Sequence, residues 1–463
     1  MRVLLVSHRY PPANTAGTEV YTAEVAKRLR ARGDEVEVFC AEKAIGEPDR
    51  SVRVREHEGV RVHEFVNNLH LTGFKETWAL PEAEAAFAVV LDSFKPDVVH
   101  INHLMYLSLG CLKEARDRRI PVVFTLHDLW LSCPRWGQRL GWDGELCHEV
   151  DLSRCGECMT HTKFAQTRLE ERISGWLSML KESTGLDLSE AARAARRALA
   201  ERGEGEGSAD STLRSAELTR ELLERDAGVR ELVNQNVTRF LSPSRFVADE
   251  LVRWGLDEAR VEHLGTGLSE GDVVERAPRS EKLRVRFLGS LIPSKGAHIL
   301  VEAWGAMSSE ARACGELTLF GPRGHDAAYT SELERRAEAA GAVYGGVLKR
   351  EEISHELAQS DLVCLPSLWF ENLPLVVLEA RAAGVPSLVS DLGGLAEAVP
   401  EPIGGWRFPA GDVGALARKL EELLLKPALL DAVEVPSAPS AEVHFARLFE
   451  VYGEAVDLEE GGA

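Results

Sequence analysis

Short apolar runs alternate with longer segments of helical spacing along the first 130 residues. The chain opens with the apolar run RVLLVS at 2–7, and the segment TEVYTAEVAKRLRARG at 18–33 then places apolar residues at roughly helical spacing and ends on glycine. A second run, DEVEVFCAE, follows at 34–42. A buried strand, a helix and another strand in this order predict a parallel β-α-β unit.

The same alternation continues further along the chain. The apolar runs PDVVHIN at 96–102 and IPVVFTLHD at 120–128 flank a helical pattern near 107–118. We therefore expect a doubly wound α/β domain at the N-terminus. The pattern lapses between about 131 and 236, which predicts an insertion with four cysteines, helices and a flexible loop, GEGEGSADS at 203–211.

A second series of buried strands is predicted after residue 270. Its apolar runs are LRVRFL, GELTLF, SDLVCL and VPSLVS, with helical patterns between them, and a final amphipathic pattern covers about 440–455. The predicted fold class is α/β with two Rossmann-like doubly wound domains. We expect the first at 1–269, completed by a C-terminal helix at about 438–463 and carrying the insertion at about 131–236, and the second at 270–437.

Composition narrows the classes of function. The chain has 463 residues, 44% hydrophobic, which is enough for two or three domains. Its net charge of −20 makes sequence-independent binding to nucleic acid a poor hypothesis. The N-terminal apolar run is too short for a secretory signal, and no stretch reaches the ~18 apolar residues of a membrane span. We expect a cytoplasmic protein whose eight cysteines are reduced.

The stretch SLWFENLPLVVLEARAAG at 367–384 holds two glutamates, Glu371 and Glu379, on either side of a predicted helix start. Asn372 is a suitable N-cap, Pro374 suits the first turn, and Gly384 suits the end. The N–H groups and positive dipole end of such a helix favour a phosphate or diphosphate.

On spacing alone, two solvated glutamates would be the simpler interpretation. The apolar run LPLVVLEA instead predicts that Glu379 lies among buried residues, and Glu371 follows a buried strand, where ligands bind in such sheets. Carboxylates accept hydrogen bonds from sugar hydroxyls. A nucleotide sugar, with hydroxyls on both sides of a diphosphate, has the matching layout.

This stretch resembles the Glu-x7-Glu motif of the retaining family-4 glycosyltransferases, which have the GT-B fold. The resemblance covers residues 1–130 and 237–430 and includes, in the family's order, the first loop and helix and the motifs TLHDLW, FLGSLIPSKG, AVYGGVL, SDLVCLPS and GGWRFPAGD. It implies that the two domains face each other across a cleft. It also implies transfer of a sugar from a UDP- or GDP-sugar to a glycan, lipid-linked or small-molecule acceptor, with retention of the anomeric configuration. The acceptor would bind the N-terminal domain and the donor the C-terminal domain, in the synthesis of a polysaccharide, glycolipid or glycoconjugate.

The resemblance also implies roles for individual residues. Glu379 would bind the ribose, Glu371 would contact the transferred sugar, and Lys295 would neutralise the diphosphate. His127 would lie beside the donor sugar. The remaining donor-binding residues would be Asn372, Leu373 and Pro374 at the helix start, Gly17 in the first loop, and position 290.

Two positions depart from the family's pattern. Ser290 stands where an arginine is usual, so Arg323 or Lys349 would have to compensate for the missing cation. Ala16 and Gly17 stand where two glycines are usual. The chain also contains no Asp-x-Asp, the pair that commonly holds a metal-bound diphosphate. We expect Lys295 and the helix start to replace it, and hence no catalytic metal.

The insertion carries Cys133, Cys147, Cys155 and Cys158 within 26 residues, ending in CGEC. This grouping favours a structural zinc site. An iron–sulfur cluster or four unrelated thiols stay open as alternatives. The other cysteines, at 40, 111, 314 and 364, are predicted to be core residues.

The segment 163–202 carries eight basic and six acidic residues in an otherwise acidic chain. It suits peripheral contact with an anionic membrane face or a lipid-linked acceptor, although two solvated helices are the simpler interpretation. Two other functions stay open. A dinucleotide-dependent oxidoreductase would need a Gly-x-Gly-x-x-Gly loop that HRYPPANTAGTE does not provide. A non-catalytic sugar-nucleotide-binding protein is suggested by Ser290.

Overall fold

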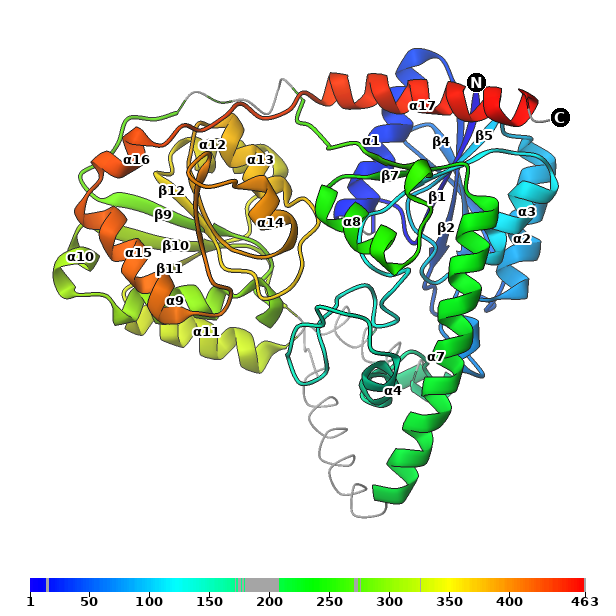
Figure 1. Ribbon diagram of the computed structural model, residues 1–463, viewed down its shortest axis with the longest axis horizontal. Coiled ribbons are helices and arrows are strands. Elements are labelled where there is room, and N and C mark those ends of the chain that lie inside the picture. Colours follow the sequence, from blue (N-terminus) through cyan, green and yellow to red (C-terminus); the bar gives the residue numbers. More distant parts are fainter. Residues whose placement is uncertain are drawn as a thin grey trace. The chain divides into compact units, whose positions relative to one another are not determined.

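The computed structural model describes residues 1–13, 16–170, 208–269, 276–324 and 326–461, together with positions 172, 173, 176, 179 and 274. The chain forms two compact units (Figure 1). Unit 1 comprises Met1–Ser242, Ala248–Glu262 and Leu448–Ala463, and unit 2 comprises Pro243–Val247 and His263–Arg447. The main breaks thus follow Glu262 and Arg447, where the sequence pattern suggested residues 269 and 437.

Unit 1 is built on an eight-stranded sheet with the order β3-β4-β2-β1-β5-β6-β7-β8. The pairs from β4 through β2, β1, β5 and β6 to β7 are parallel, and the edge pair β3–β4 is antiparallel. The strands are β1 Arg2–Ser7, β2 Glu35–Glu42, β3 Val52–His57, β4 Val60–Val66, β5 Val98–Ile101, β6 Val122–Thr125, β7 Arg239–Ser242 and β8 Val261–His263. Strands β5 and β6 are buried at every position, as continuous apolar runs predict for a covered parallel sheet.

The helices and turns of this part of the chain are α1 Gly17–Arg32, η1 Phe74–Thr77, α2 Pro81–Phe94, α3 Gly110–Asp117, α8 Arg245–Trp254 and η2 Glu258–Arg260. The last helix, α17, spans Ala441–Gly461, and its residues from Leu448 onwards belong to unit 1. Its buried Tyr452 forms a hydrogen bond of 2.6 Å with Nδ1 of His100 on β5. The terminal helix is therefore part of the core of unit 1.

The insertion between β6 and β7 contains α4 Leu152–Thr160 and the long helix α7 Ser208–Asn236, which pack side by side (Figure 1). Met159 of α4 and Leu218 and Leu222 of α7 form a small buried cluster with Phe74. The prediction of a flexible loop at 203–211 is wrong for 208–211, which form the first turn of α7. Residues 203–207, and most of the basic segment 163–202, lie outside the described residues.

Unit 2 contains a six-stranded parallel sheet with the order β11-β10-β9-β12-β13-β14. Its strands are β9 Leu283–Leu288, β10 Gly315–Phe320, β11 Val343–Gly346, β12 Leu362–Leu365, β13 Ser387–Ser390 and β14 Gly405–Phe408. Counted along the chain, this is the order 3-2-1-4-5-6 of a doubly wound sheet, whose direction of growth reverses between β9 and β12.

The two faces of this sheet carry separate apolar clusters. Phe287 and Cys364 lie in the cluster with α9 Ala297–Ala306 and α15 Val413–Leu425. Val363 and Val389 lie in the other, with α12, α13 and α14. The other helices and turns are η4 Pro293–Lys295, α10 Ser309–Ala313, α11 Ala327–Ala339, α12 Arg350–Ala358, α13 Leu375–Ala382, α14 Gly393–Ala398 and α16 Ala428–Ala432.

Among the described residues, no helix combines the length and the apolar character needed to cross a membrane.

Candidate active site

The sheet of unit 2 brings two loops together where its strand order reverses. Strand β9 leads into η4, which ends at Lys295, and β12 leads into the loop that holds Glu371. The strands pair in parallel, with Leu362 opposite Val285, so both loops leave the same edge of the sheet. Ligands of doubly wound sheets bind at this reversal point.

Lys295 and Glu371 meet directly. The Lys295 ammonium donates to Oε1 of Glu371 at 2.7 Å, and its nitrogen lies 5.1 Å from the centre of the Trp369 ring. The same oxygen accepts hydrogen bonds from the Ser367 hydroxyl at 2.8 Å and from the Trp369 indole at 2.6 Å. Three donors on one oxygen hold the carboxylate in a fixed orientation. The sequence pattern did not indicate Ser367 or Trp369.

The turn that carries Lys295 is locked against the loop of Glu371. Gly296 has φ of +71°, and a Cβ atom there would lie 1.8 Å from the carbonyl oxygen of Pro366. The backbone N–H of Leu368 also donates to the carbonyl of Ser294 at 2.8 Å. Glycine is required because of both its backbone conformation and this close approach. The two loops therefore hold Lys295 and Glu371 at a fixed spacing.

Glu379 lies on α13 and is 5% exposed. It forms an ion pair with Arg350, the first residue of α12, whose side chain is largely exposed. Burial of a carboxylate is costly unless it is paired, so this contact explains how Glu379 is tolerated. Arg350 was missed from the sequence because its partner lies on another helix.

The start of α13 differs from the prediction. The helix begins at Leu375 with Pro374 as its N-cap, and Asn372 is not the cap. The side-chain oxygen of Asn372 instead accepts a hydrogen bond of 2.6 Å from Ser244, also in unit 2. Leu373 packs against the apolar cluster beneath α13. Gly384 does follow the helix end in the left-handed conformation, with φ of +67°, as predicted.

Position 290 lies in the loop after β9. Arg323 is close to it in the backbone, since Leu291 forms an isolated bridge with Arg323, but its side chain pairs with Glu334 at 2.7 Å. Lys349 is the N-cap residue of α12. In the described residues, the cations that contact the two glutamates are Lys295 and Arg350.

The corresponding edge of unit 1 carries histidines and carboxylates. His8 follows β1 and forms a 3.3 Å contact with the buried Glu19 of α1. His103 follows β5, accepts the backbone N–H of Met105 on Nδ1, and so donates from Nε2 to Asp128 at 3.2 Å. The sequence pattern indicated none of these four side chains, although each histidine follows a buried strand.

His127 lies beside this group. Its Nε2 atom is 3.3 Å from Oδ1 of Asn102, and its ring centre is 5.0 Å from that of Tyr21. Burial lowers the pKa of His127 to about 3, and burial also lowers the pKa of His8 despite the Glu19 carboxylate. Burial alone would raise the pKa of Asp128, but His103 and the N–H of Trp130 outweigh it and the pKa is lowered. Neutral histidines and charged carboxylates therefore coexist at neutral pH.

Several buried polar atoms at this edge have no hydrogen-bond partner among the described residues: Ser7 Oγ, His8 Nδ1, Glu19 Oε2 and Asn102 Nδ2. Unsatisfied buried groups cost ~1–3 kcal/mol each, so such a set is typical of a site that binds a polar ligand or ordered water. Gly17 is the first residue of α1, and no described atom lies within 4 Å of where its Cβ would be.

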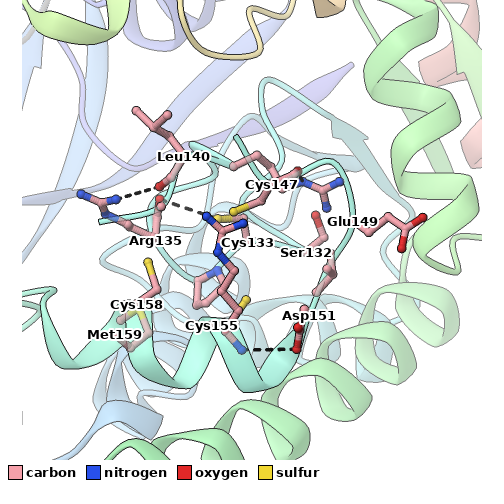
Figure 2. A pocket seen from close by; sticks show the side chains of 15 residues that line it. Ser132, Cys133, Arg135, Leu140, Cys147, Glu149, Asp151, Cys155, Cys158 and Met159 are labelled. Carbon is pink, nitrogen blue, oxygen red and sulfur yellow. Dashed lines mark hydrogen bonds between the residues drawn. The ribbon is translucent and has the colours of Figure 1, made fainter. Parts of the chain in front are cut away.

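The four cysteines of the insertion line one small cavity of about 30 Å³ (Figure 2). All are free thiols. Within the described part of the chain, no three His, Cys, Asp or Glu side chains are already arranged as a metal-binding group, so zinc stays a prediction at this point. Cys40, Cys111 and Cys364 are buried as predicted, whereas Cys314 is only partly buried and packs against the apolar cluster of unit 2.

Comparison with known proteins agrees with this architecture. Residues 16–171 match a family model described as a glycosyl transferase 4-like domain, and residues 282–426 match one described as glycosyl transferases group 1. A glycogen synthase of Mycobacterium tuberculosis is 24% identical over 92% of this chain and 87% of its own. The amylovoran biosynthesis glycosyltransferase AmsK of Erwinia amylovora is 27% identical over 43% of this chain and 50% of its own.

Two solved structures share the fold. HepE of Anabaena, in complex with UDP and glucose, matches with a TM-score of 0.62 and 15% identity over 98% of this chain and 100% of its own. The sucrose-phosphate synthase of Thermosynechococcus elongatus matches with a TM-score of 0.61 and 16% identity over 98% of each chain. The predicted GT-B fold is confirmed, and the chain belongs to the glycosyltransferases with this fold.

Proposed function

We propose that this glycosyltransferase moves a sugar from a nucleotide-diphosphate sugar to an acceptor hydroxyl and retains the configuration of the anomeric carbon. A nucleotide-sugar donor is supported by similar structures that were solved with UDP, glucose or UDP-glucose. Retention is supported by the Glu371 and Glu379 pair, which resembles the motif of a retaining family.

The observation that carries the proposal is the contact between Lys295 and Glu371 at the reversal point of unit 2. Lys295 is partly exposed and held above an indole ring, so a diphosphate that enters this edge meets a pre-positioned cation. Negative charge develops on the diphosphate as the sugar leaves, and a fixed cation stabilises that charge without a metal ion. Divalent metal is therefore not required for the chemical step.

Glu371 and Glu379 then have separate tasks. The hydrogen bonds that described side chains donate to Glu371 end on Oε1, and Oε2 is assigned to a hydroxyl of the transferred sugar. Glu379 is the buried partner of Arg350, and its carboxylate suits the ribose hydroxyls of the nucleotide. Arg350 supplies a cation in addition to Lys295, which is our explanation for the serine at position 290.

Retention means that the new bond forms on the face from which the diphosphate departs. Positive charge builds on the sugar ring during departure, and a carboxylate at Glu371 both orients the ring and eases that charge. We assign Glu371 to positioning, with no covalent intermediate. In this scheme the departing diphosphate oxygen accepts the proton of the incoming hydroxyl.

The acceptor is assigned to the edge of unit 1 that carries Glu19, His103 and Asp128. Its unpaired buried oxygens and nitrogens suit a ligand that offers several hydroxyl groups. This fits a glycan, a glycolipid headgroup or a small polyol. The proposed membrane contact of segment 163–202 falls mostly outside the described residues and stays a prediction.

A direct test combines a panel of UDP-, GDP- and ADP-sugars with a panel of acceptors, in buffer that contains EDTA. We expect transfer from one donor class, and NMR of the product should show the same anomeric configuration as the donor. An inverted product would contradict retention. Tight nucleotide binding without transfer or hydrolysis would favour a non-catalytic binding protein instead.

A further inference from the structure

The insertion of unit 1 brings together four thiols from three places in the chain. Cys133 lies in the loop after β6, and Cys147 lies at the end of a short hairpin closed by the bridge between Leu140 and Leu146. Cys155 and Cys158 are one turn apart on α4 and therefore share a face of that helix. All four line the same cavity, as Figure 2 shows.

This cavity is partly enclosed. Cys133 and Cys158 are each 8% exposed, whereas Cys147 and Cys155 are partly exposed. Four cysteines are the ligand set of a tetrahedral zinc site. They also suit an iron–sulfur cluster, which analysis of the bound metal distinguishes from zinc.

An independent observation concerns Arg225 of α7. This arginine is 3% exposed, and its guanidinium donates to the carbonyls of Trp130 and Leu131 at 2.7 and 3.0 Å. Among the described residues, it forms no ion pair with a carboxylate. Burial lowers the pKa of Arg225 to about 10, and the nearby thiols that would oppose this, if charged, are Cys133 and Cys155.

The arginines that line the cavity are Arg135, Arg139 and Arg154. Arg139 pairs with Glu250 at 2.8 Å and Arg154 with Asp143 at 3.0 Å, whereas Arg135 donates to the carbonyl of Leu140 at 2.7 Å. A buried cation without a counter-charge costs several kcal/mol, so Arg225 near neutral thiols of Cys133 and Cys155 would be destabilising. Thiols that bind a metal are deprotonated, which would give Arg225 the negative partner that it lacks.

We propose that the four cysteines bind one Zn²⁺ ion as thiolates and that Arg225 balances part of the charge. Four thiolates and one Zn²⁺ carry a net charge of −2, and the buried guanidinium reduces this to −1. Binding releases the four thiol protons to solvent.

The site would tie the active-site edge to the insertion. The loop from Asp128 to Cys133 begins at the carboxylate that His103 contacts, and Arg225 holds the carbonyls of its middle residues. Zinc would therefore fix the path of this loop. Its role is structural, because no thiol is left to exchange with a substrate.

The first test uses the full chain purified without chelator from a medium that contains both zinc and iron. Elemental analysis should give one zinc and no iron per chain, and replacement by Co²⁺ should give the visible bands of a tetrathiolate site. Cys155→Ser and Cys158→Ser should lose the metal and lower Tm, whereas Cys314→Ser, outside the insertion, should keep one zinc. A folded chain without zinc, or with stoichiometric iron, would overturn the proposal.

Two further measurements keep the test decisive if the cysteine variants fail to fold. Modification of the thiols in the wild-type chain should release one zinc to a coloured chelator, and its absence would contradict the assignment. Arg225→Met should weaken zinc affinity about 10- to 100-fold, as loss of groups around a metal site typically does. Arg220→Met, an exposed change on the same helix, should leave affinity unchanged. Equal affinities in both arginine variants would exclude the charge-balancing role.

Discussion

The two sheets reverse their strand order in the same way but present opposite chemistry at that point. In unit 2, Lys295 and Arg350 bring two cations to two carboxylates. In unit 1, Glu19 and Asp128 lie beside histidines, and burial lowers the pKa of His8 and His127. The shared fold therefore does not determine the ligand, which depends on the side chains placed at each edge.

The difference assigns one substrate to each unit. A diphosphate carries negative charge, so the edge with Lys295 attracts it and the edge with Glu19 and Asp128 repels it. Binding of a neutral polyol depends little on charge and mostly on hydrogen bonds. In unit 1, several buried donors and acceptors have no hydrogen-bond partner among the described residues. Each of the following predictions tests this division.

The largest effect is expected from Lys295→Ala. Loss of the cation that faces the departing diphosphate should reduce kcat about 100- to 1,000-fold, the typical cost of removing one such group. Steady-state kinetics with the best donor measures it. Lys282→Ala, an exposed lysine just before β9, serves as the control and should retain full activity. A Lys295→Ala enzyme that recovers with Mg²⁺ would show that a metal can replace the side chain.

A smaller loss of rate is expected from Glu371→Gln. The amide keeps the shape and can still accept from Trp369, but it loses the charge that faces Lys295 and the sugar. We expect kcat to fall roughly 10- to 100-fold while nucleotide Kd changes little, because the nucleotide does not include the sugar. Equal losses in kcat and Kd would mean that Glu371 only binds, and full activity would refute its assignment to the sugar.

Substitutions of two buried glutamates, one in each unit, test whether each unit binds a different substrate. Glu379→Ala should weaken nucleotide binding by ~1.5–3 kcal/mol, because a charged acceptor for the ribose is lost. Glu19→Ala should leave nucleotide Kd unchanged and raise acceptor KM. Calorimetry with the free nucleotide measures Kd, and kinetics at varied acceptor concentration measure the acceptor KM.

Exposed Glu351, next to Arg350, provides the control for these variants, and Glu351→Ala should change neither constant. A loss of nucleotide affinity in Glu19→Ala would place part of the donor on unit 1 and break the division proposed here.

The smallest effect concerns the pH dependence of stability. His127 stays neutral in the folded chain because burial lowers its pKa to about 3, whereas the unfolded chain binds a proton near pH ~6.5. The contribution of His127 to the free energy of unfolding is therefore complete above pH ~6.5 and is lost as the pH falls toward 3. Between pH 7 and pH 5, Tm of the wild type should fall by roughly 2–4 °C more than Tm of His127→Gln. His355→Gln, at an exposed position, should follow the wild type.

The sequence predicted the elements of unit 2 and pointed to Lys295, Glu371 and Glu379 as candidate site residues, because each signal was local. Lys295 follows the strand LRVRFL, Glu371 precedes an apolar helix, and Glu379 lies within that helix. Arg350 and Trp369 were missed because their roles depend on contacts across helices or within a folded loop. Asn372 was assigned to a cap on its residue type, yet its side chain bonds to Ser244, which is remote in sequence.

The same reasoning explains what was missed in unit 1. His8, His103 and Asp128 follow three different strands, and they meet only because β1, β5 and β6 are adjacent in the sheet. A reader of the sequence who first fixed this strand order could have listed the polar residue after each strand. Glu19 would still have been missed, since its burial depends on the start of α1.

Gly296 sets a limit on how this chain can vary. Its neighbour in space is a main-chain carbonyl, that of Pro366, and not a side chain. No substitution elsewhere can shrink that oxygen, so a mutation at Gly296 should have no second-site suppressor within the loop. In a saturation-mutagenesis screen for activity, only glycine should be tolerated at position 296, whereas exposed positions nearby should tolerate many residues. This pattern of tolerated residues would by itself identify the turn that holds Lys295.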